Sequence, residues 1–509
     1  MKTTPIRETH PVTAPVEHLA EVEHPAFPSI LLTDPINWAI NPYQSTSWQH
    51  HFMSLRWIST NFDSDKLFEI LKSFYRFHCV RQAKNPYYNQ MRGDHAGSIR
   101  LRQLISFRDR FLKLENVPAT GICDRLIKAD IDNLQSSQMY RHGHNHGLMV
   151  DILLLQIWKE NPRFRLSIKA DVVAARGLET LNKMFDENGI TLEHSISYQE
   201  HNYPLAIQFL ELHPNHQSED VIKRKKKLET TTKRILAWAL RDAGEYFAMG
   251  DTLRTPSAQI RTKHPEIVAT PRELSLLGTK GNRLYTEGGF FFYKRKFDST
   301  NVQCKNIHFS ATCGWNSINH KQDDELSFCL EVDGNIIFDD PGYTVNIQAR
   351  DERLRKSSSH STVEILNSPF CDAKQFPIGS SITSWLELDD GFTLNMSHQR
   401  IAAHLISRQI SLQGDTMGIR DSVTPVPAQT LNAAHNFVLH PEINIQIENT
   451  VVLLYKSNVL MAEIRPSSSS GEWQSETIDY IGTDKYKYLS TIKLSFHSSQ
   501  KNCEFQIKF

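Results

Sequence analysis

The chain has 509 residues, of which 39% are hydrophobic, and its 57 Lys and Arg residues balance 57 Asp and Glu residues to a formal net charge of zero. This length is too great for one hydrophobic core, so at least two domains are expected. The balanced charge offers no basic field for nucleic acid, and no apolar stretch of about 18 residues is present to span a membrane. An acidic ligand would therefore need a locally positive cleft.

The N-terminal region leads to two expectations. Residues 1–30 contain five prolines among polar residues, which favours an irregular arm. The same region has no apolar run of signal-peptide length, which predicts a cytoplasmic protein and leaves export to the periplasm or the outside by another route open. The seven cysteines are scattered and form no CxxC pair, a pattern typical of free thiols.

Residues 31–265 are expected to form an all-α domain. From Trp48 onwards, apolar residues recur three and four positions apart, as in GLMVDILLLQIWKE and KLETTTKRILAWALRD. This spacing is typical of amphipathic helices. A succession of such segments without a convincing strand between them predicts helical hairpins.

Residues 266–509 have a different pattern. Short runs with alternating apolar residues, such as GGFFFYKRKF, HLISRQISLQ and STIKLSFH, are separated by Gly, Asn and Asp. Many short strands with frequent turn residues predict an antiparallel β-sandwich. The whole chain is therefore expected to be an α+β multidomain protein.

Two groups of polar residues stand before predicted helices. His144, Asn145 and His146 precede a strongly apolar helix, and the free N–H groups of its first turn could hold a carboxylate together with the Asn amide and the imidazoles. A capping role explains Asn145 and His146 equally well. Glu193 and Tyr198 precede another helix, and a single tyrosine is usually structural.

A third group comprises His320, Gln322, Asp340 and His360, in the segments HKQDDELSF, DGNIIFDDPGY and HST. Each of these residues alone is more often structural than functional. Their concentration on neighbouring predicted strands and turns makes them candidates for a site.

Taken in order, these segments resemble the heparinase II/III-like superfamily of polysaccharide lyases, which includes heparinase and alginate lyase types. The similarity covers about residues 40–365, from NPYQSTSW through DHAGSIR, NHG, EHSISY and TEGGFFFYK to the HKQDDELSF, DGNIIFDDPG and HST segments. It implies an N-terminal (α/α) toroid followed by a C-terminal antiparallel β-sandwich, with substrate in a cleft between them.

The resemblance also implies cleavage of a uronic-acid-containing polysaccharide by β-elimination. Asn145 and His146 match the family pair that neutralises the uronate carboxylate, while Tyr198 and His320 match the residues that transfer protons. Such roles are needed because the C5 proton cannot leave until hydrogen bonds and positive charge stabilise the enolate-like intermediate. Tyr198 then needs either a lowered pKa or a geometry in which one group takes and returns the proton. One sugar ring is expected between the phenol and the imidazole.

Further substrate contacts are expected from His144, Glu193, His201, Arg100 and Tyr343. The implied partner is an acidic polysaccharide or oligosaccharide, for example a bacterium's own exopolysaccharide, with no nucleic acid or membrane partner. The sequence carries no signal for a particular oligomeric state. No organic cofactor is expected, because no phosphate-binding glycine loop lies at a strand-to-helix junction.

The family's metal triad falls on Gln322, Asp340 and His360, which would hold a structural divalent cation such as zinc. Gln322 replaces the usual histidine, and its amide oxygen is a poorer zinc ligand than imidazole. The sequence is therefore compatible with a bound cation and with none.

Two alternatives keep the same site. A uronate C5-epimerase would remove the same C5 proton and return one to the other face of the sugar. A glycan-binding protein without catalysis is the second alternative, suggested by Gln322. A glycoside hydrolase is less favoured, because the prominent residues are Asn, His and Tyr rather than a pair of carboxylates.

Overall fold

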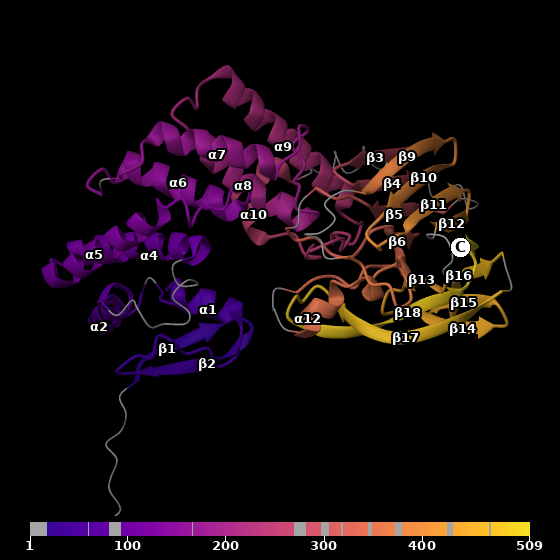
Figure 1. The fold of residues 1–509 in the computed structure, drawn as a ribbon, viewed down its shortest axis with the longest axis horizontal. Coiled ribbons are helices and arrows are strands. Elements are labelled where there is room, and N and C mark those ends of the chain that lie inside the picture. The colour runs from indigo at the N-terminus through magenta and orange to yellow at the C-terminus, as the bar shows by residue number, and fades with distance from the viewer. Residues whose placement is uncertain are drawn as a thin grey trace, which may run out of the picture. The chain divides into compact units, whose positions relative to one another are not determined.

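The computed structural model describes the chain except for residues 1–17, 60, 81–92, 165, 269–280, 297–304, 317–318, 345–348, 372–378, 425–430 and 468–469. The chain divides into two compact units. Unit 1 takes in Met1–Arg141 and Gln156–Lys169, and unit 2 takes in His142–Leu155 and Ala170–Phe509 (Figure 1). This division falls within the helical part of the chain, whereas the sequence pattern placed a domain boundary near residue 265.

Unit 1 is mainly helical. Its helices are α1 (Thr46–Met53), α2 (Ser64–Tyr75), α4 (Asp94–Lys113) and α5 (Val117–Leu134), with a short π-helical turn at Arg76–Val80. Polar side chains cap three of the N-termini, because a free N–H group of the first turn needs an acceptor: Ser45 caps α1, Asp63 caps α2 and Asn116 caps α5.

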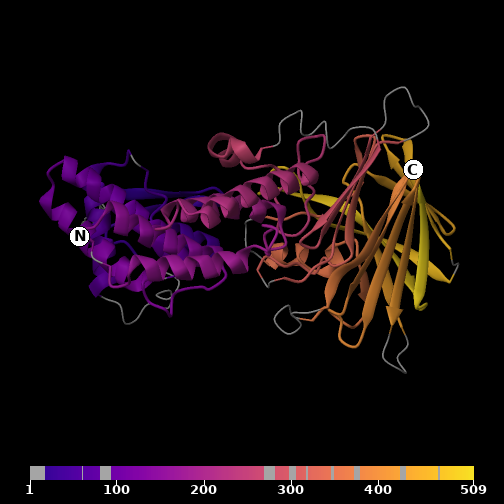
Figure 2. The same ribbon diagram turned by 90° about the horizontal axis from the view of Figure 1, so that it is seen from above.

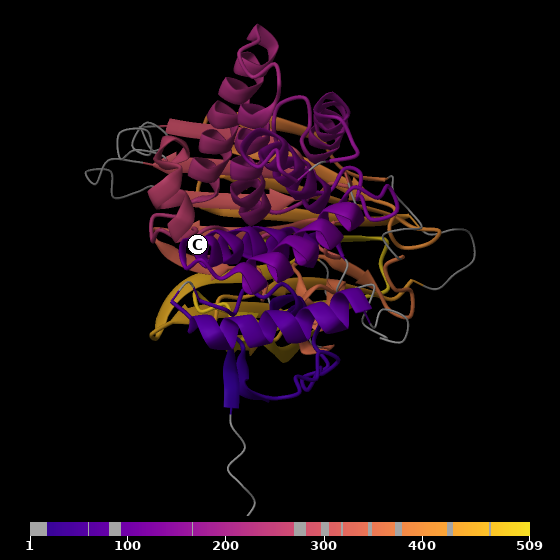
Figure 3. The ribbon, with the colours of Figure 1, turned by 90° about the vertical axis from the view of Figure 1, so that its left-hand side faces the viewer.

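The predicted irregular arm is wrong from residue 18 onwards. Strands β1 (His18–His24) and β2 (Phe27–Thr33) pair in an antiparallel hairpin, drawn in indigo in Figures 1 and 3. The hairpin forms because Val22 and Leu32 bury their side chains while their neighbours stay largely exposed. Pro25 lies in the turn, where a fixed φ is tolerated. Residues 1–17 of the predicted arm lie outside the described residues.

Unit 2 begins with helices. They are α6 (Asn145–Glu160, whose last residues belong to unit 1), α7 (Ala170–Met184), α8 (Ile196–Leu212), α9 (Glu219–Ala239) and α10 (Ala258–Lys263). Gly177 lets α7 approach α8 closely, because a Cβ there would lie 2.2 Å from the Phe209 ring. The predicted helices are confirmed, while their arrangement as a toroid stays a prediction. Among the described residues, no helix is long and apolar enough to cross a membrane.

The rest of unit 2 is an antiparallel sandwich of three sheets, the orange and yellow part of the chain in Figures 1 and 2. The five-stranded sheet contains β3 (Gly281–Glu287), β4 (Phe290–Lys296), β5 (Ile307–Thr312), β6 (Ser327–Val332) and β7 (Asn335–Phe338) in that order. The four-stranded sheet has the order β17 (Gly471–Ile481), β18 (Tyr488–Ser498), β13 (Ala433–Val438) and β8 (Val363–Ile365). The eight-stranded sheet has the order β14 (Asn444–Glu448), β15 (Val451–Lys456), β16 (Val459–Pro466), β19 (Asn502–Lys508), β12 (Thr416–Thr424), β11 (Leu405–Gln413), β10 (Gly391–His398) and β9 (Ser380–Leu388). A short helix, α12 (Ala349–Leu354), precedes β8.

One hydrophobic core joins the three sheets. Phe291 and Phe309 of the five-stranded sheet pack on Phe392 of the eight-stranded sheet, with ring centroids 4.9 and 5.0 Å apart. Phe437 of the four-stranded sheet packs on Phe505 of the same eight-stranded sheet at 5.1 Å. The predicted sandwich is therefore confirmed as an antiparallel, sheet-rich region.

The outer face of the five-stranded sheet is covered by helical residues. The His308 Nε2 atom lies 3.0 Å from the carbonyl oxygen of Trp238 in α9, and Lys294 donates to the carbonyl of Leu240. Both faces of β4 and β5 are consequently buried. This packing brings the loops at the N-terminus of α8 and after α9 to the five-stranded sheet, and these loops carry the candidate site.

Candidate active site

The first turn of α8 is tied to the segment Met249–Leu253. The Oγ1 atom of Thr252 accepts the backbone N–H of Ile196 at 2.9 Å, and the backbone N–H of Leu253 donates to Ser197 Oγ at 2.8 Å. Ser195 caps the helix by accepting the N–H of Tyr198. These bonds fix the backbone of Tyr198 against the segment that carries Asp251.

Gly250 makes this approach feasible. Its φ is +59°, in the left-handed region that favours glycine, and a Cβ at this position would lie 2.1 Å from the carbonyl oxygen of His194. Any other residue would force the two backbones apart. The position of Asp251 beside residues 193–195 therefore depends on a glycine at 250.

His320 lies at the centre of the site. Its Nδ1 atom is 2.9 Å from Asp251 Oδ2, and its ring stacks on Tyr198 with centroids 3.5 Å apart and planes at 23°. Its Nε2 atom is 3.3 Å from Glu193 Oε2, close enough for an ion pair but not aligned as a hydrogen bond. The backbone of His320 has a φ of +55°. The stacked rings leave no space between them, so the expected sugar ring between imidazole and phenol is wrong.

A chain of amides connects His320 to the N-terminus of α6. Asn202 donates to Glu193 Oε1 at 3.1 Å and accepts from Asn145 Nδ2 at 3.3 Å. The Oδ1 atom of Asn145 is buried and has no hydrogen-bond partner among the described residues. Burial raises the pKa of Glu193, although His320 and Asn202 oppose this rise. The fold thus brings Asn145, Glu193, Tyr198 and His320 together within unit 2.

The remaining histidines of the group lie close by. The backbone N–H of His146 donates to His144 Nδ1 at 3.1 Å, and the two rings contact each other edge to face at 4.4 Å. His201 lies one helical turn from Tyr198, with ring centroids 5.9 Å apart. His201 is an exposed residue. Desolvation by the surrounding protein, together with the charges of His320 and His146, nevertheless lowers its pKa to about 4. His201 is therefore an uncharged group at neutral pH.

The phenol of Tyr198 is not pre-ionised. Burial raises its pKa above the ordinary value, and the nearby Tyr343, Asp251 and Glu193 raise it further. The expected lowered pKa is wrong, because burial and the carboxylates around the phenol outweigh the opposing charge of Arg355. Tyr343, predicted as a substrate contact, is near enough to Tyr198 to act on its ionisation.

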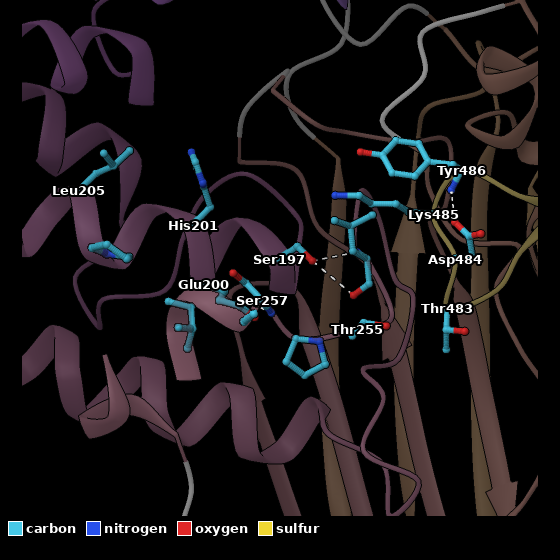
Figure 4. A pocket seen from close by; sticks show the side chains of 15 residues that line it. Ser197, Glu200, His201, Leu205, Thr255, Ser257, Thr483, Asp484, Lys485 and Tyr486 are labelled. Atoms are coloured by element: carbon cyan, nitrogen blue, oxygen red, sulfur yellow. Dashed lines mark hydrogen bonds between the residues drawn. The ribbon is translucent and has the colours of Figure 1, made fainter. Parts of the chain in front are cut away.

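His201 also lines a cavity of about 640 Å³, whose lining includes neither Tyr198 nor His320 (Figure 4). Ser197, His201 and Leu205 of α8 line one side of the view, and the segment Thr483–Tyr486 between β17 and β18 lines the other. Side chains from residues 253–260 add to the lining. The cavity has the size to hold sugar rings, since ligand pockets in proteins are commonly about 300–1,000 Å³.

Arg100 is not available to a substrate. Its guanidinium is fully buried in unit 1, where it donates to both oxygens of Asp130 at 2.8 and 2.6 Å and to the carbonyl of Met53. The prediction for Arg100 is therefore wrong. The sequence around a helical arginine does not indicate whether its side chain faces the core or a cleft.

The residues of the predicted metal triad make hydrogen bonds within the protein, while the buried Gln322 Oε1 and His360 Nε2 atoms have no partner among the described residues. His360 Nδ1 and Asp340 Oδ2 are 2.8 Å apart, a direct hydrogen bond that leaves no room for an ion between them. The amide of Gln322 donates to Asp251 at 2.7 Å instead of joining this pair. Within the described residues, no group of three or more His, Cys, Asp or Glu side chains is arranged to hold a metal ion. The six cysteines among the described residues form no disulfide bonds, as expected.

Three site residues escaped the sequence analysis. Asp251 and Arg355 belong to loops without a recognisable motif, and no local pattern predicts them. Asn202 carried a usable signal, because it follows Tyr198 by one helical turn and therefore shares its face of α8.

Comparisons with known proteins agree with this architecture. Residues 279–509 match the family described as heparinase II/III-like, C-terminal. A comparison with curated proteins gives no significant match. Among solved structures, the chain is similar to a heparinase III crystal structure, with a TM-score of 0.69, 13% identity, and coverage of 93% of this chain and 78% of that chain.

Two further solved structures give the same result. A heparinase III gene product with methylated lysines has a TM-score of 0.63 and 14% identity, covering 95% of this chain and 81% of that chain. The heparan sulfate lyase HepC from Pedobacter heparinus has a TM-score of 0.58 and 14% identity, covering 96% and 81%. At these identities the likeness shows a shared fold. The protein therefore has a heparinase-like fold, in which helices are followed by a C-terminal region rich in antiparallel sheet. The match over residues 279–509 and the shared fold support the heparinase II/III-like superfamily.

Proposed function

We propose that the protein is a polysaccharide lyase that cleaves a uronic-acid-containing polysaccharide by β-elimination. The observation that carries this proposal is the cluster of Asn145, Glu193, Tyr198 and His320, which lie far apart in the sequence and are joined by the contacts described above. The solved structures of similar fold are described as heparinase III and heparan sulfate lyase, which supports the same class of reaction.

The uronate carboxylate is assigned to the N-terminus of α6. Asn145 and His146 begin this helix, where backbone N–H groups and the helix dipole favour an anion. Partial neutralisation of the carboxylate there stabilises the enolate-like intermediate that forms when the C5 proton leaves. His144, in ring contact with His146, and the uncharged His201 provide further polar surface for the sugar.

Proton transfer is assigned to His320 and Tyr198. His320 Nε2 takes the C5 proton, the C5–H electron pair becomes the C4=C5 double bond, and O4 departs with the Tyr198 phenol proton. The raised pKa of Tyr198 suits a group that must be protonated before the reaction. Glu193, 3.3 Å from Nε2, stabilises the imidazolium that results. Because the two rings are stacked, both present their edges to the same side of a bound sugar.

The experiment is a screen of the purified protein against uronate polymers, with the ultraviolet absorbance of the unsaturated product as the readout. We expect absorbance to rise with at least one polymer. Incorporation of solvent deuterium at C5 without chain cleavage would instead identify a uronate C5-epimerase. Binding without either reaction would contradict catalysis and favour a glycan-binding protein.

A further inference from the structure

Asp251 is a buried carboxylate with an unusual concentration of donors. It is 1% exposed, and four contacts converge on it. Arg355 Nη1 lies 2.5 and 2.6 Å from its two oxygens, Gln322 Nε2 donates at 2.7 Å, and His320 Nδ1 lies at 2.9 Å. A buried charge is tolerated only when paired and hydrogen-bonded, and these contacts satisfy that condition.

The partners of Asp251 come from separate parts of the chain. Gln322 belongs to the same turn as His320, and Arg355 follows α12. Arg355 also donates to the carbonyl of Lys321, and the backbone N–H of Asp323 donates to the carbonyl of Arg355 at 2.9 Å. The Asp251 carboxylate and the backbone of the His320 turn are therefore held by one guanidinium.

We propose that Asp251 is a positioning residue that holds His320 with its proton on Nδ1 and leaves Nε2 as the proton acceptor. The reason is the hydrogen-bond inventory: a carboxylate can only accept, so the imidazole nitrogen that is hydrogen-bonded to Asp251 must be the N–H. Glu193 Oε2 lies 3.3 Å from Nε2 without the alignment of a hydrogen bond, so it places no proton on that nitrogen. Arg355 and Gln322 orient the carboxylate, and the carboxylate orients the ring. The inference rests on the proposed lyase function, in which Nε2 takes the C5 proton.

This arrangement gives Gln322 a role that the metal interpretation did not. Its amide N–H₂ supports the carboxylate that orients His320.

The test is Asp251→Asn, an isosteric change. Arg355 can only donate, so it would hold the one side-chain oxygen that remains, and the new N–H₂ group would face His320 and favour the opposite tautomer. We expect kcat to fall by about 10²–10⁴-fold, with KM changed less than about threefold, because the sugar contacts remain. Nitrogen NMR of histidine-labelled protein, with the His320 signals assigned by loss in His320→Gln, should show the Nδ1–H form in the parent and its loss in Asp251→Asn.

A matched control is available in the sandwich. Asp421 is equally buried, pairs with Arg408 at 2.7 and 2.8 Å, and lies 2.7 Å from His435 Nδ1. Like Asp251→Asn, Asp421→Asn removes a buried carboxylate that contacts an arginine and a histidine, but it does so away from the site. We expect it to lower thermal stability and to leave kcat within about twofold, because it touches no site residue.

The outcomes separate the possible failures. If Asp251→Asn folds and retains kcat within about threefold of the parent, the positioning role is overturned. If the parent protein shows no lyase activity on any polymer, the proposed function fails, but the NMR comparison still supports or refutes the tautomer assignment. If Asp251→Asn does not fold, Arg355→Gln replaces it, and an unchanged His320 tautomer with unchanged kcat in that variant would contradict the proposal.

Discussion

The imidazole of His320 lies flat against the phenol ring of Tyr198, with ring centroids 3.5 Å apart. In the proposed mechanism, both proton-transfer groups therefore act from one side of the substrate rather than from opposite sides. Each ring limits the movement of the other, and a change in one is expected to affect the geometry of its neighbour.

Replacement of Tyr198 by Phe keeps the ring and its stacking on His320 but removes the phenolic proton. We expect turnover to fall by at least about a hundredfold, the lower end of what one positioned acid or base contributes, with folding intact. Initial rates by double-bond absorbance, with circular dichroism as the folding control, check this. Near-normal turnover in a folded variant would remove Tyr198 from the mechanism.

Replacement of His320 by Ala removes the assigned C5 base. We expect kcat to fall far more than substrate affinity, because the carboxylate of the sugar is held elsewhere, at Asn145 and His146. Steady-state kinetics and direct binding to an oligosaccharide separate the two effects. A loss confined to affinity would mean that His320 only binds the substrate.

The cavity beside α8 can be tested by filling it. Leu205→Trp places a larger side chain in the lining of the cavity, which includes neither Tyr198 nor His320. We expect KM to rise several-fold with kcat nearly unchanged, because the change blocks sugar binding remote from the reacting atoms. Val117→Trp, at an exposed position in unit 1, is the matched control and should leave both constants unchanged. An unaltered KM in Leu205→Trp would show that the cavity holds no part of the substrate.

The buried pair His435 and Asp421 should make stability depend on pH. Burial lowers the pKa of His435, but the hydrogen bonds and charges of Asp421 and Cys503 together outweigh this effect and raise the pKa from 6.5 to about 9. Because the pKa of His435 is higher in the folded state, its full contribution to the free energy of unfolding is present below pH 6.5. This contribution is lost as the pH rises through 9. Its size is on the order of 3 kcal/mol.

The measurement is the difference in thermal midpoint between the parent and His435→Gln at several pH values. We expect the advantage of the parent to shrink steadily from pH 6.5 to pH 9. A constant difference across that range would show that the pair does not titrate as the contacts imply.

The direct Asp340–His360 hydrogen bond leads to a prediction about metal. We expect purified protein to contain no stoichiometric zinc, and a chelator to change the thermal midpoint by less than about 2 °C. Elemental analysis and thermal unfolding with and without chelator check this. A clear loss of stability on chelation would restore Gln322, Asp340 and His360 as a metal site.

Some strands could be predicted from their sequences and others could not. Strands such as β10 and β11 alternate buried and partly exposed residues, and this alternation is visible in their sequences. Strands β5 and β13 are buried on both faces and show no such alternation, whereas β4, which is almost as buried, is recognisable from its run of aromatic residues. The burial of β5 and β13 comes from neighbours that are distant in the chain, such as α9 over β5, so only the tertiary structure could reveal these two strands.

The sequence by itself determined the helical and sheet-rich parts of this protein and indicated Asn145, Tyr198 and His320 as candidate site residues, because periodicity and short motifs are local properties of a chain. Only the tertiary structure decided what those residues touch. Asp251 and Arg355 are 104 positions apart, and Asp251 and His320 are 69 apart. Buried charges pair with whichever partners the fold brings near, and for the same reason Arg100 lies in a core ion pair and Gln322 donates to Asp251.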